Sequence, residues 1–287
     1  MEVGIDARLS SSDGVVLALH DYNPGSRGPT VLFSHATGFH GRCFDPVAGE
    51  LLATHHCVTF DYRGFGDSTL PPDWRVHWSA FGDDTLTAAN HAIETSKRGG
   101  PIIGAGHSMG GAALVMAALR APQLFRALVL FEPIIFPPVS DKSNGGSNQL
   151  VEGARKRRTT FASFDDALAN YSSKPPLNVF HPAALRAYVM FGFRQLLDDS
   201  VTLKCSPEHE ARTYETGGID EIWENLAKLT VPTWVISGVE LPNSPATIAK
   251  FIAEAIPSSH FVRYDDLTHF GPMQDPGRFA KAIREVG

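Results

Sequence analysis

Short hydrophobic runs recur along the chain, and segments with helical periodicity separate them. Near-continuous apolar runs of about five residues are typical of strands that are covered on both faces of a sheet. Seven such runs occupy residues 15–20, 30–34, 56–61, 102–106, 127–132, 233–237 and 260–264. Because strand-like and helix-like segments alternate, the pattern predicts an α/β domain with a mostly parallel sheet.

The predicted helices lie between or after these runs, at residues 44–53, 79–97, 110–119, 244–255 and 275–285. The segment 110–119 is rich in alanine and other small residues, so it can pack closely on a sheet. The segment 244–255 starts with a serine and has a proline in its first turn, which are typical helix-start signals.

The alternation stops between Pro137 and Gly218, where no clear strand run is present. This stretch opens with two prolines and a Gly/Ser/Asn-rich loop, and helix-like segments follow. We therefore predict a core domain of residues 1–136 and 219–287, with residues 137–218 inserted as a helical cap or lid. The basic cluster Arg155–Arg158 predicts a solvated surface of this cap or, alternatively, a contact with an acidic group of a substrate.

Composition adds few constraints. The chain has 287 residues, a formal net charge of −6 and 20% charged residues, a balance that gives no signal for nucleic-acid binding. No apolar run is long enough to span a membrane, and the first residues lack a secretory pattern, so we expect a cytoplasmic protein. The three cysteines, Cys43, Cys57 and Cys205, are widely spaced and predict reduced thiols. The sequence implies no cofactor and no metal, and it leaves the oligomeric state open, with a homodimer as one alternative.

The most informative motif is Gly106-His107-Ser108-Met109-Gly110, a G-x-S-x-G sequence between a predicted strand and the small-residue helix. A tight turn at this place needs glycines on both sides of the serine and lifts its hydroxyl above the edge of the sheet. It also puts the start of a helix next to the reacting atom, where backbone N–H groups can stabilise an oxyanion. The motif predicts that Ser108 is a nucleophile.

Four motifs together resemble the α/β-hydrolase superfamily: SHATGF at 34–39, DYRGFGDS at 61–68, GHSMGG at 106–111 and THFGPMQDP at 268–276. They occur in the order of that superfamily and span nearly the whole chain. The resemblance implies a mostly parallel, eight-stranded α/β-hydrolase sheet flanked by helices, with the cap inserted after the sixth strand. The segment 61–68 is interpreted as a structural turn.

A serine nucleophile needs a base, and His269, between the last predicted strand and the last helix, is the best candidate. The fold implied by the resemblance brings this loop back to the serine. The other histidines considered, His35, His107 and His260, are predicted to be structural. The resemblance also implies that the backbone N–H groups of Thr37 and Met109 form the oxyanion hole, although this sequence has an alanine at 36 where many relatives have glycine.

The acid that orients the base has two candidates. Many relatives carry it three residues beyond a glycine after the seventh strand, and here that position is Leu241, which cannot serve. Glu132, at the end of the sixth strand, matches the position used by a branch that includes haloalkane dehalogenases and some lactonases. Glu240, next to the unsuitable leucine, remains the alternative acid.

Serine rather than aspartate at position 108 favours acyl transfer over alkyl-enzyme chemistry. We expect hydrolysis of a small, largely apolar carboxylic ester or lactone, with this small molecule as a partner and with neither nucleic acid nor a membrane as one. Aromatic residues near the predicted strand ends are candidates for substrate binding: Phe39, Trp74, Trp78, Phe136 and Phe191. Three alternatives use the same residues: a ligand receptor without turnover, a C–C bond hydrolase and a cofactor-free perhydrolase.

Overall fold

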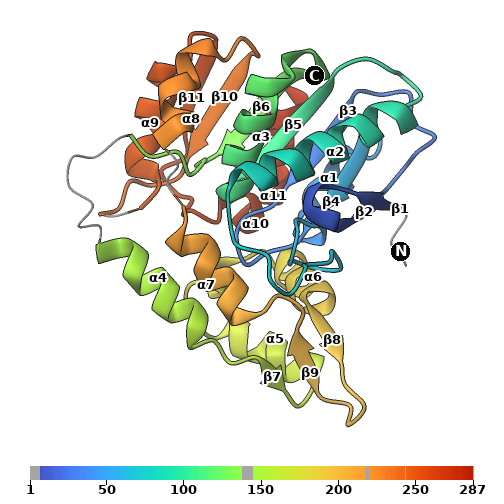
Figure 1. Ribbon diagram of the computed structural model, residues 1–287, viewed down its shortest axis with the longest axis vertical. Coiled ribbons are helices and arrows are strands. Elements are labelled where there is room, and N and C mark those ends of the chain that lie inside the picture. The colour runs from blue at the N-terminus through green and yellow to red at the C-terminus, as the bar shows by residue number, and fades with distance from the viewer. Residues whose placement is uncertain (1–6, 138–144, 218–219, 243, 287) are drawn as a thin grey trace.

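The computed structural model describes residues 7–137, 145–217, 220–242 and 244–286. Its centre is one eight-stranded sheet with the order β1-β2-β4-β3-β5-β6-β10-β11 (Figure 1). The strands are β1 (Ala7–Ser10), β2 (Val16–Asp21), β3 (Thr30–Ser34), β4 (His56–Phe60), β5 (Ile102–His107), β6 (Phe125–Phe131), β10 (Thr233–Ser237) and β11 (Ser259–Arg263). All neighbouring pairs from β4 to β11 are parallel, whereas β2 is antiparallel to both of its neighbours.

Helices cover both faces of this sheet, so its inner strands are buried on both sides, as their apolar runs predict. One face packs against α2 (Ser79–Thr95), α3 (Met109–Arg120) and α9 (Ala246–Ala255). The opposite face packs against α1 (Asp45–Leu51) and α11 (Pro276–Arg284). The short helices α8 (Asp220–Asn225) and α10 (Gly271–Gln274) complete the core.

The seven predicted strands all form within two residues of their expected ends. The eighth, β1, has only four residues with alternating exposure, too short a pattern to stand out in the sequence. The predicted start of α9 was wrong: the helix begins at Ala246, and the Ser244 hydroxyl instead accepts the N–H of Leu241 in the preceding turn.

Between β6 and β10 the chain leaves the sheet, and we call residues 145–217 the inserted segment. It contains α4 (Gly145–Arg155), α5 (Phe164–Ser172), α6 (Pro182–Gly192) and α7 (Pro207–Glu215). It also contains a small antiparallel sheet of β7 (Thr160–Phe161), β9 (Val201–Leu203) and β8 (Phe193–Gln195), which corrects the prediction of a purely helical insertion. Strands of two or three residues are too short to show a period of two in the sequence.

The inserted segment forms the lower layer in Figure 1. Hydrogen bonds and an ion pair connect it to the loops of the core. Its Lys204 Nζ lies 2.8 Å from Asp67 Oδ2, and His209 Nε2 donates to the Arg63 carbonyl over 3.0 Å. From the core side, the indole N–H of Trp78 donates to the Thr213 carbonyl over 3.1 Å. These contacts fix the segment to the turn at 61–68 and to the start of α2.

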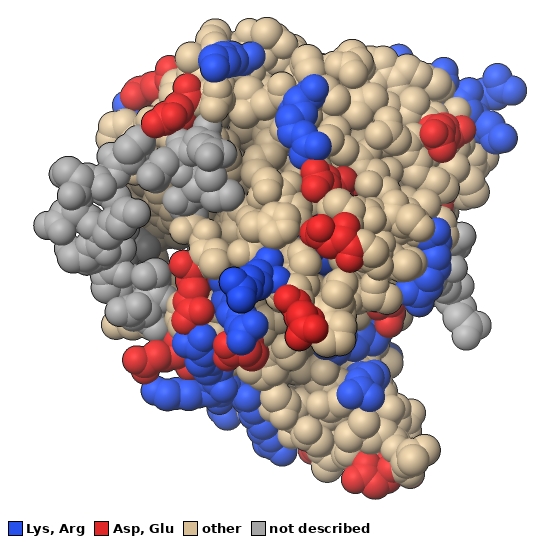
Figure 2. Space-filling model, viewed as in Figure 1, with Lys and Arg blue, Asp and Glu red and all other residues tan. Residues whose placement is uncertain are grey.

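The predicted basic cluster divides into exposed and buried members. Arg155 pairs with Glu208 and Glu215, and Lys156 pairs with Glu152, all at the surface. Figure 2 shows basic and acidic side chains mixed over this face of the molecule. Arg157 differs because it turns inward and is largely buried.

In the described ranges, no helix combines the length and the apolar character needed to cross a membrane.

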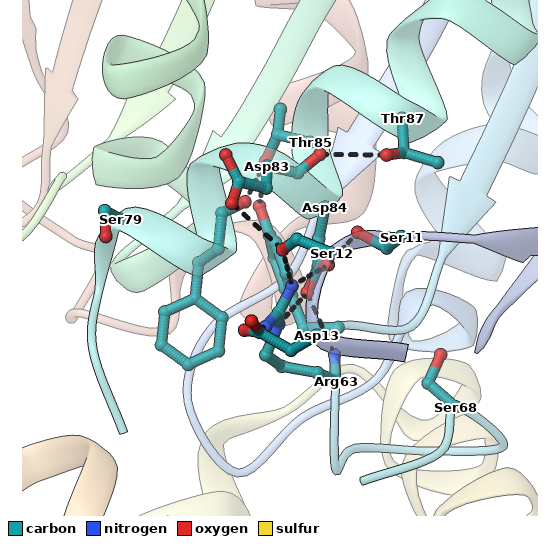
Figure 3. A network of polar contacts seen from close by, with 12 residues as sticks. Ser11, Ser12, Asp13, Arg63, Ser68, Ser79, Asp83, Asp84, Thr85 and Thr87 are labelled. Carbon is teal, nitrogen blue, oxygen red and sulfur yellow. Dashed lines mark hydrogen bonds and ion pairs between the residues drawn. The ribbon is translucent and has the colours of Figure 1, made fainter. Parts of the chain in front are cut away.

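A buried ion network holds the turn at 61–68 in place (Figure 3). The Arg63 guanidinium is fully buried and donates to both carboxylate oxygens of Asp84, at 2.8 and 2.7 Å. It also donates to Asp13 and to the hydroxyl of Ser12, each over 2.8 Å. The network therefore ties together the segment after β1, the turn after β4 and helix α2, in agreement with the structural role predicted for the turn.

We predict that Arg63→Met lowers the free energy of unfolding by about 3–5 kcal/mol, because it leaves the buried Asp84 carboxylate without its charged partner. Urea denaturation measures this. Arg120→Met is the matched control, since it removes an exposed pair with Asp83, and we expect it to cost no more than about 1 kcal/mol. Equal losses for the two variants would contradict the analysis.

Candidate active site

Ser108 lies in the tight turn between β5 and α3, and its backbone is strained, with φ of +56°. Glu132 has φ of +43°, so two of the four described non-glycine residues with positive φ are site candidates. The glycines around the serine are required sterically. A Cβ atom at Gly110 would lie 2.1 Å from the Ser34 carbonyl oxygen, and one at Gly106 would lie 2.9 Å from Gly111. The sequence motif therefore forms the turn that it predicts.

Glu132 and His269 come together although 137 residues separate them. The Nδ1–H group of His269, in the loop between β11 and α10, donates to Glu132 Oε2 over 2.6 Å. The second carboxylate oxygen, Oε1, accepts the backbone N–H of Gly238 over 2.7 Å. Glu132 is only 1% exposed, and a buried carboxylate requires such partners.

The alternative acid Glu240 lies elsewhere. It is half exposed, and it pairs at the surface with Arg263, whose Nη2 lies 2.7 Å from Glu240 Oε2. Leu241, at the position where many relatives have the acid, is exposed. The structure thus brings Glu132, and not Glu240, to His269.

Ser108 is 8% exposed, next to the loop that carries His269. Within the described part of the chain, no hydrogen bond joins the Ser108 hydroxyl to His269. Such bonds are often long in unliganded sites and shorten when a substrate binds.

His107 connects the serine turn to the loop of the candidate base. Its Nε2–H group donates to the His269 carbonyl over 2.7 Å, and the two rings lie 4.8 Å apart. Burial is the main cause that holds the pKa of His107 well below the usual 6.5, so the ring is neutral. The structural role predicted for His107 agrees with these contacts.

Thr37 and Met109, the predicted oxyanion donors, are in contact, because the Thr37 hydroxyl donates to the Met109 sulfur over 3.3 Å. Among the backbone hydrogen bonds of the described residues, none uses the N–H group of either residue. His35 fixes this loop: Nδ1–H donates to the Ala36 carbonyl, and Nε2 accepts the N–H of Tyr62. Both bonds fit a neutral ring, and burial lowers the pKa of His35 to about 4.

An aromatic cluster lies beside the serine turn. The Phe39 ring contacts His107 at 6.0 Å, Tyr188 at 5.4 Å and Phe180 at 5.9 Å between centroids. Phe270 joins the cluster through Phe39 and Phe180. The sequence identified Phe39 but missed the other aromatic members. Phe270 could have been found, because it directly follows His269.

The remaining aromatic candidates occupy other places. Phe191 lies under the Arg42 guanidinium at 3.4 Å, in an open groove of about 410 Å³. Phe136 is partly buried in the segment that follows β6.

No group of three or more histidine, cysteine or acidic side chains in the described ranges is arranged to hold a metal ion. All three cysteines are described, and all have free thiols. Burial raises the pKa of Cys57 to about 12, so this thiol is protonated and unreactive at neutral pH.

Comparison with protein families agrees with this geometry. The model of the alpha/beta hydrolase family matches residues 31–282. The chain belongs to this family. The fold prediction is therefore confirmed, both by the family match and by the observed sheet.

Two curated relatives match a part of this chain. The type I acyl-CoA thioesterase mpaH of Penicillium roqueforti is 28% identical over 143 residues, which are 44% of this chain and 33% of the relative. Lipase LipV of Mycobacterium tuberculosis is 30% identical over 122 residues, 42% of this chain and 44% of the lipase. The matched part thus spans less than half the length of either relative.

A solved structure covers the chain more completely. E-2-(acetamidomethylene)succinate hydrolase superimposes with a TM-score of 0.79 and 21% identity, over 98% of this chain and 97% of that one. At this identity the likeness supports the fold alone.

We predict that the protein loses stability as the pH falls from about 6.5 towards 4. Burial lowers the pKa values of His35, His40 and His209 to about 4, whereas the unfolded chain binds their protons near 6.5. Their contribution is complete above pH 6.5 and is lost in this window, at about 1.4 kcal/mol per pH unit for each histidine. Urea denaturation at several pH values measures the slope.

His209→Gln supplies the control, because this side chain lies outside the candidate site. The slope of unfolding free energy against pH should become shallower by about 1.4 kcal/mol per pH unit, the contribution of one proton. An unchanged slope would show that His209 is not a neutral buried group.

Proposed function

We propose that this hydrolase is a serine esterase that cleaves small, largely apolar carboxylic esters, thioesters or lactones through an acyl-enzyme on Ser108. The observation that carries the proposal is the hydrogen bond between the buried Glu132 and the partly exposed His269, at the strand ends beside the strained serine turn. A nucleophile, a base and an orienting acid on three separate loops are the parts that acyl transfer requires.

The hydrogen bond to Glu132 determines which ring nitrogen of His269 acts as the base. Because Nδ1 carries the proton that Glu132 accepts, Nε2 is left with a lone pair for the serine proton. The carboxylate then stabilises the imidazolium that forms. His269 returns the proton to the leaving alcohol or thiol, and afterwards activates the water that hydrolyses the acyl-enzyme.

The oxyanion of each tetrahedral intermediate would be stabilised by the backbone N–H groups of Thr37 and Met109. Their side chains touch, which supports a common role at one oxygen atom. Met109 is also the first residue of α3, so the positive end of the helix dipole lies at the same place.

The substrate class rests on the nucleophile and on the surroundings. Serine forms acyl rather than alkyl intermediates, and the printed names of the two relatives, a thioesterase and a lipase, support ester or thioester chemistry. The aromatic cluster of Phe39, Phe180, Tyr188 and Phe270 supports an apolar acyl group.

The first test is steady-state hydrolysis of p-nitrophenyl esters and simple lactones of increasing acyl length. We expect multiple turnovers by the wild type, and a loss of kcat of at least about 10,000-fold in Ser108→Ala, because the nucleophile is removed. Binding without turnover by the wild type would favour a ligand receptor and overturn the proposal.

Two glutamate variants test the acid. Glu132→Gln should lower kcat roughly 1,000- to 10,000-fold. A glutamine carries one acceptor oxygen for two donors, the His269 Nδ1–H and the Gly238 N–H, and has no charge to stabilise the imidazolium. Glu240→Gln should leave kcat within about twofold, since it breaks only a surface ion pair. The opposite ranking would assign the acid to Glu240.

A further inference from the structure

A buried ion pair of the inserted segment contacts the loop of residues 36–40, which we call the oxyanion loop. Arg157 Nη1 lies 2.5 Å from Glu210 Oε2, and the side chains are 18% and 8% exposed. The two residues follow α4 and lie in α7, respectively. The ion pairs of Arg155, Lys156 and Arg212 nearby are at the surface, whereas this pair is largely buried.

The contact is made at Gly38, whose φ of +78° lies in the region that favours glycine. A Cβ atom at this position would lie 2.6 Å from Glu210 Oε1 and 3.5 Å from Arg157 Nη1. The carboxylate therefore packs directly on the backbone of the oxyanion loop, one residue after Thr37, and leaves no room for a side chain.

The orientation of the pair is fixed from the other side. Arg157 Nη2 donates to the hydroxyl groups of Tyr171, on α5, and Tyr188, on α6. Tyr188 also packs its ring on Phe39, and its carbonyl accepts Nε2–H of His40 over 3.1 Å. Side chains from α5, α6 and α7, and from the turn after α4, thus converge on the oxyanion loop.

This geometry separates two interpretations of the basic cluster. An arginine that binds an acidic substrate group needs an uncompensated charge facing the substrate. The charge of Arg157 is instead compensated by Glu210 at 2.5 Å, and two tyrosine hydroxyls occupy further donor sites of the guanidinium. The observations favour a role directed at the loop rather than at a substrate.

We propose that Arg157 and Glu210 are positioning residues that hold the oxyanion loop, so that the inserted segment controls how well the Thr37 N–H group meets the developing oxyanion. This inference rests on the proposed function, in which Thr37 supplies that donor. Such donors act only when they are held in place within a fraction of an ångström. A more mobile Gly38 would therefore reduce the stabilisation of the transition state more than it reduces the affinity for the substrate.

The decisive variant is Glu210→Gln, which keeps the shape of the side chain and removes its charge. We expect kcat for a p-nitrophenyl ester to fall about 10- to 100-fold, with KM changed less than threefold. We also expect faster amide hydrogen exchange in a peptide covering residues 34–41. Glu208→Gln is the matched control on the same helix, since it breaks an exposed ion pair with Arg155 and Arg212, and both measurements should stay at wild-type values.

A double variant, Arg157→Met with Glu210→Leu, separates positioning from folding. Apolar replacements of a buried ion pair commonly restore stability. The double variant should therefore unfold at a urea concentration near that of the wild type while kcat stays low. Recovery of kcat together with stability would overturn the positioning role.

Two further outcomes would contradict the inference. Wild-type kcat and wild-type exchange in Glu210→Gln would show that the pair does not hold the loop. A rise in KM confined to esters with an acidic group would assign Arg157 to substrate binding. If the wild type hydrolyses no ester, the proposed function fails, and the exchange measurement alone still decides whether the pair fixes the loop.

Discussion

A buried charge needs hydrogen-bond partners in place of water, and the geometry of the candidate site depends on the partners of the Glu132 carboxylate. One carboxylate oxygen accepts from the His269 ring and the other from the Gly238 backbone. The three groups follow β6, β11 and β10, which are neighbours in the sheet. The order of strands therefore places the acid and the base side by side, and the acid in turn fixes the proton on one ring nitrogen.

The same constraint recurs at other junctions of the chain. Arg63 and Asp84 join the turn after β4 to helix α2, and Arg157 and Glu210 join the inserted segment to the oxyanion loop. In each case a buried charge has a single main counter-ion that comes from a distant part of the sequence. Segments that hydrophobic packing alone would locate only loosely are thereby given defined positions. Two buried histidines beside the serine turn, His35 and His107, also fix the positions of loops. Each donates a hydrogen bond to a backbone carbonyl, and each is neutral because burial lowers its pKa.

Much of this organisation is visible in the sequence. Apolar runs located the inner strands, because burial on both faces leaves little freedom in composition. The G-x-S-x-G turn located Ser108, and the leucine at position 241 directed attention to Glu132. What the sequence could not show is contact between distant side chains. Nothing near Arg157 distinguishes it from the exposed Arg155, and its partner is 53 residues away on another helix. Tyr188 of α6 and the short strands β7 to β9 were missed for the same reason, since each becomes recognisable only when the inserted segment packs on the core.

The position of the acid also has a consequence for the loop after β10. In relatives with the acid on that loop, its length and path must preserve a catalytic side chain. Here the loop donates the backbone N–H of Gly238 to Glu132 and that of Val239 to the Leu267 carbonyl, and the side chains that follow, Glu240 and Leu241, are at the surface. Residues 240–242 are therefore a place where the chain can be lengthened, or a peptide or a second domain inserted, without touching the groups that hold His269. The sequence and length of this loop can therefore change independently of the pair formed by Glu132 and His269.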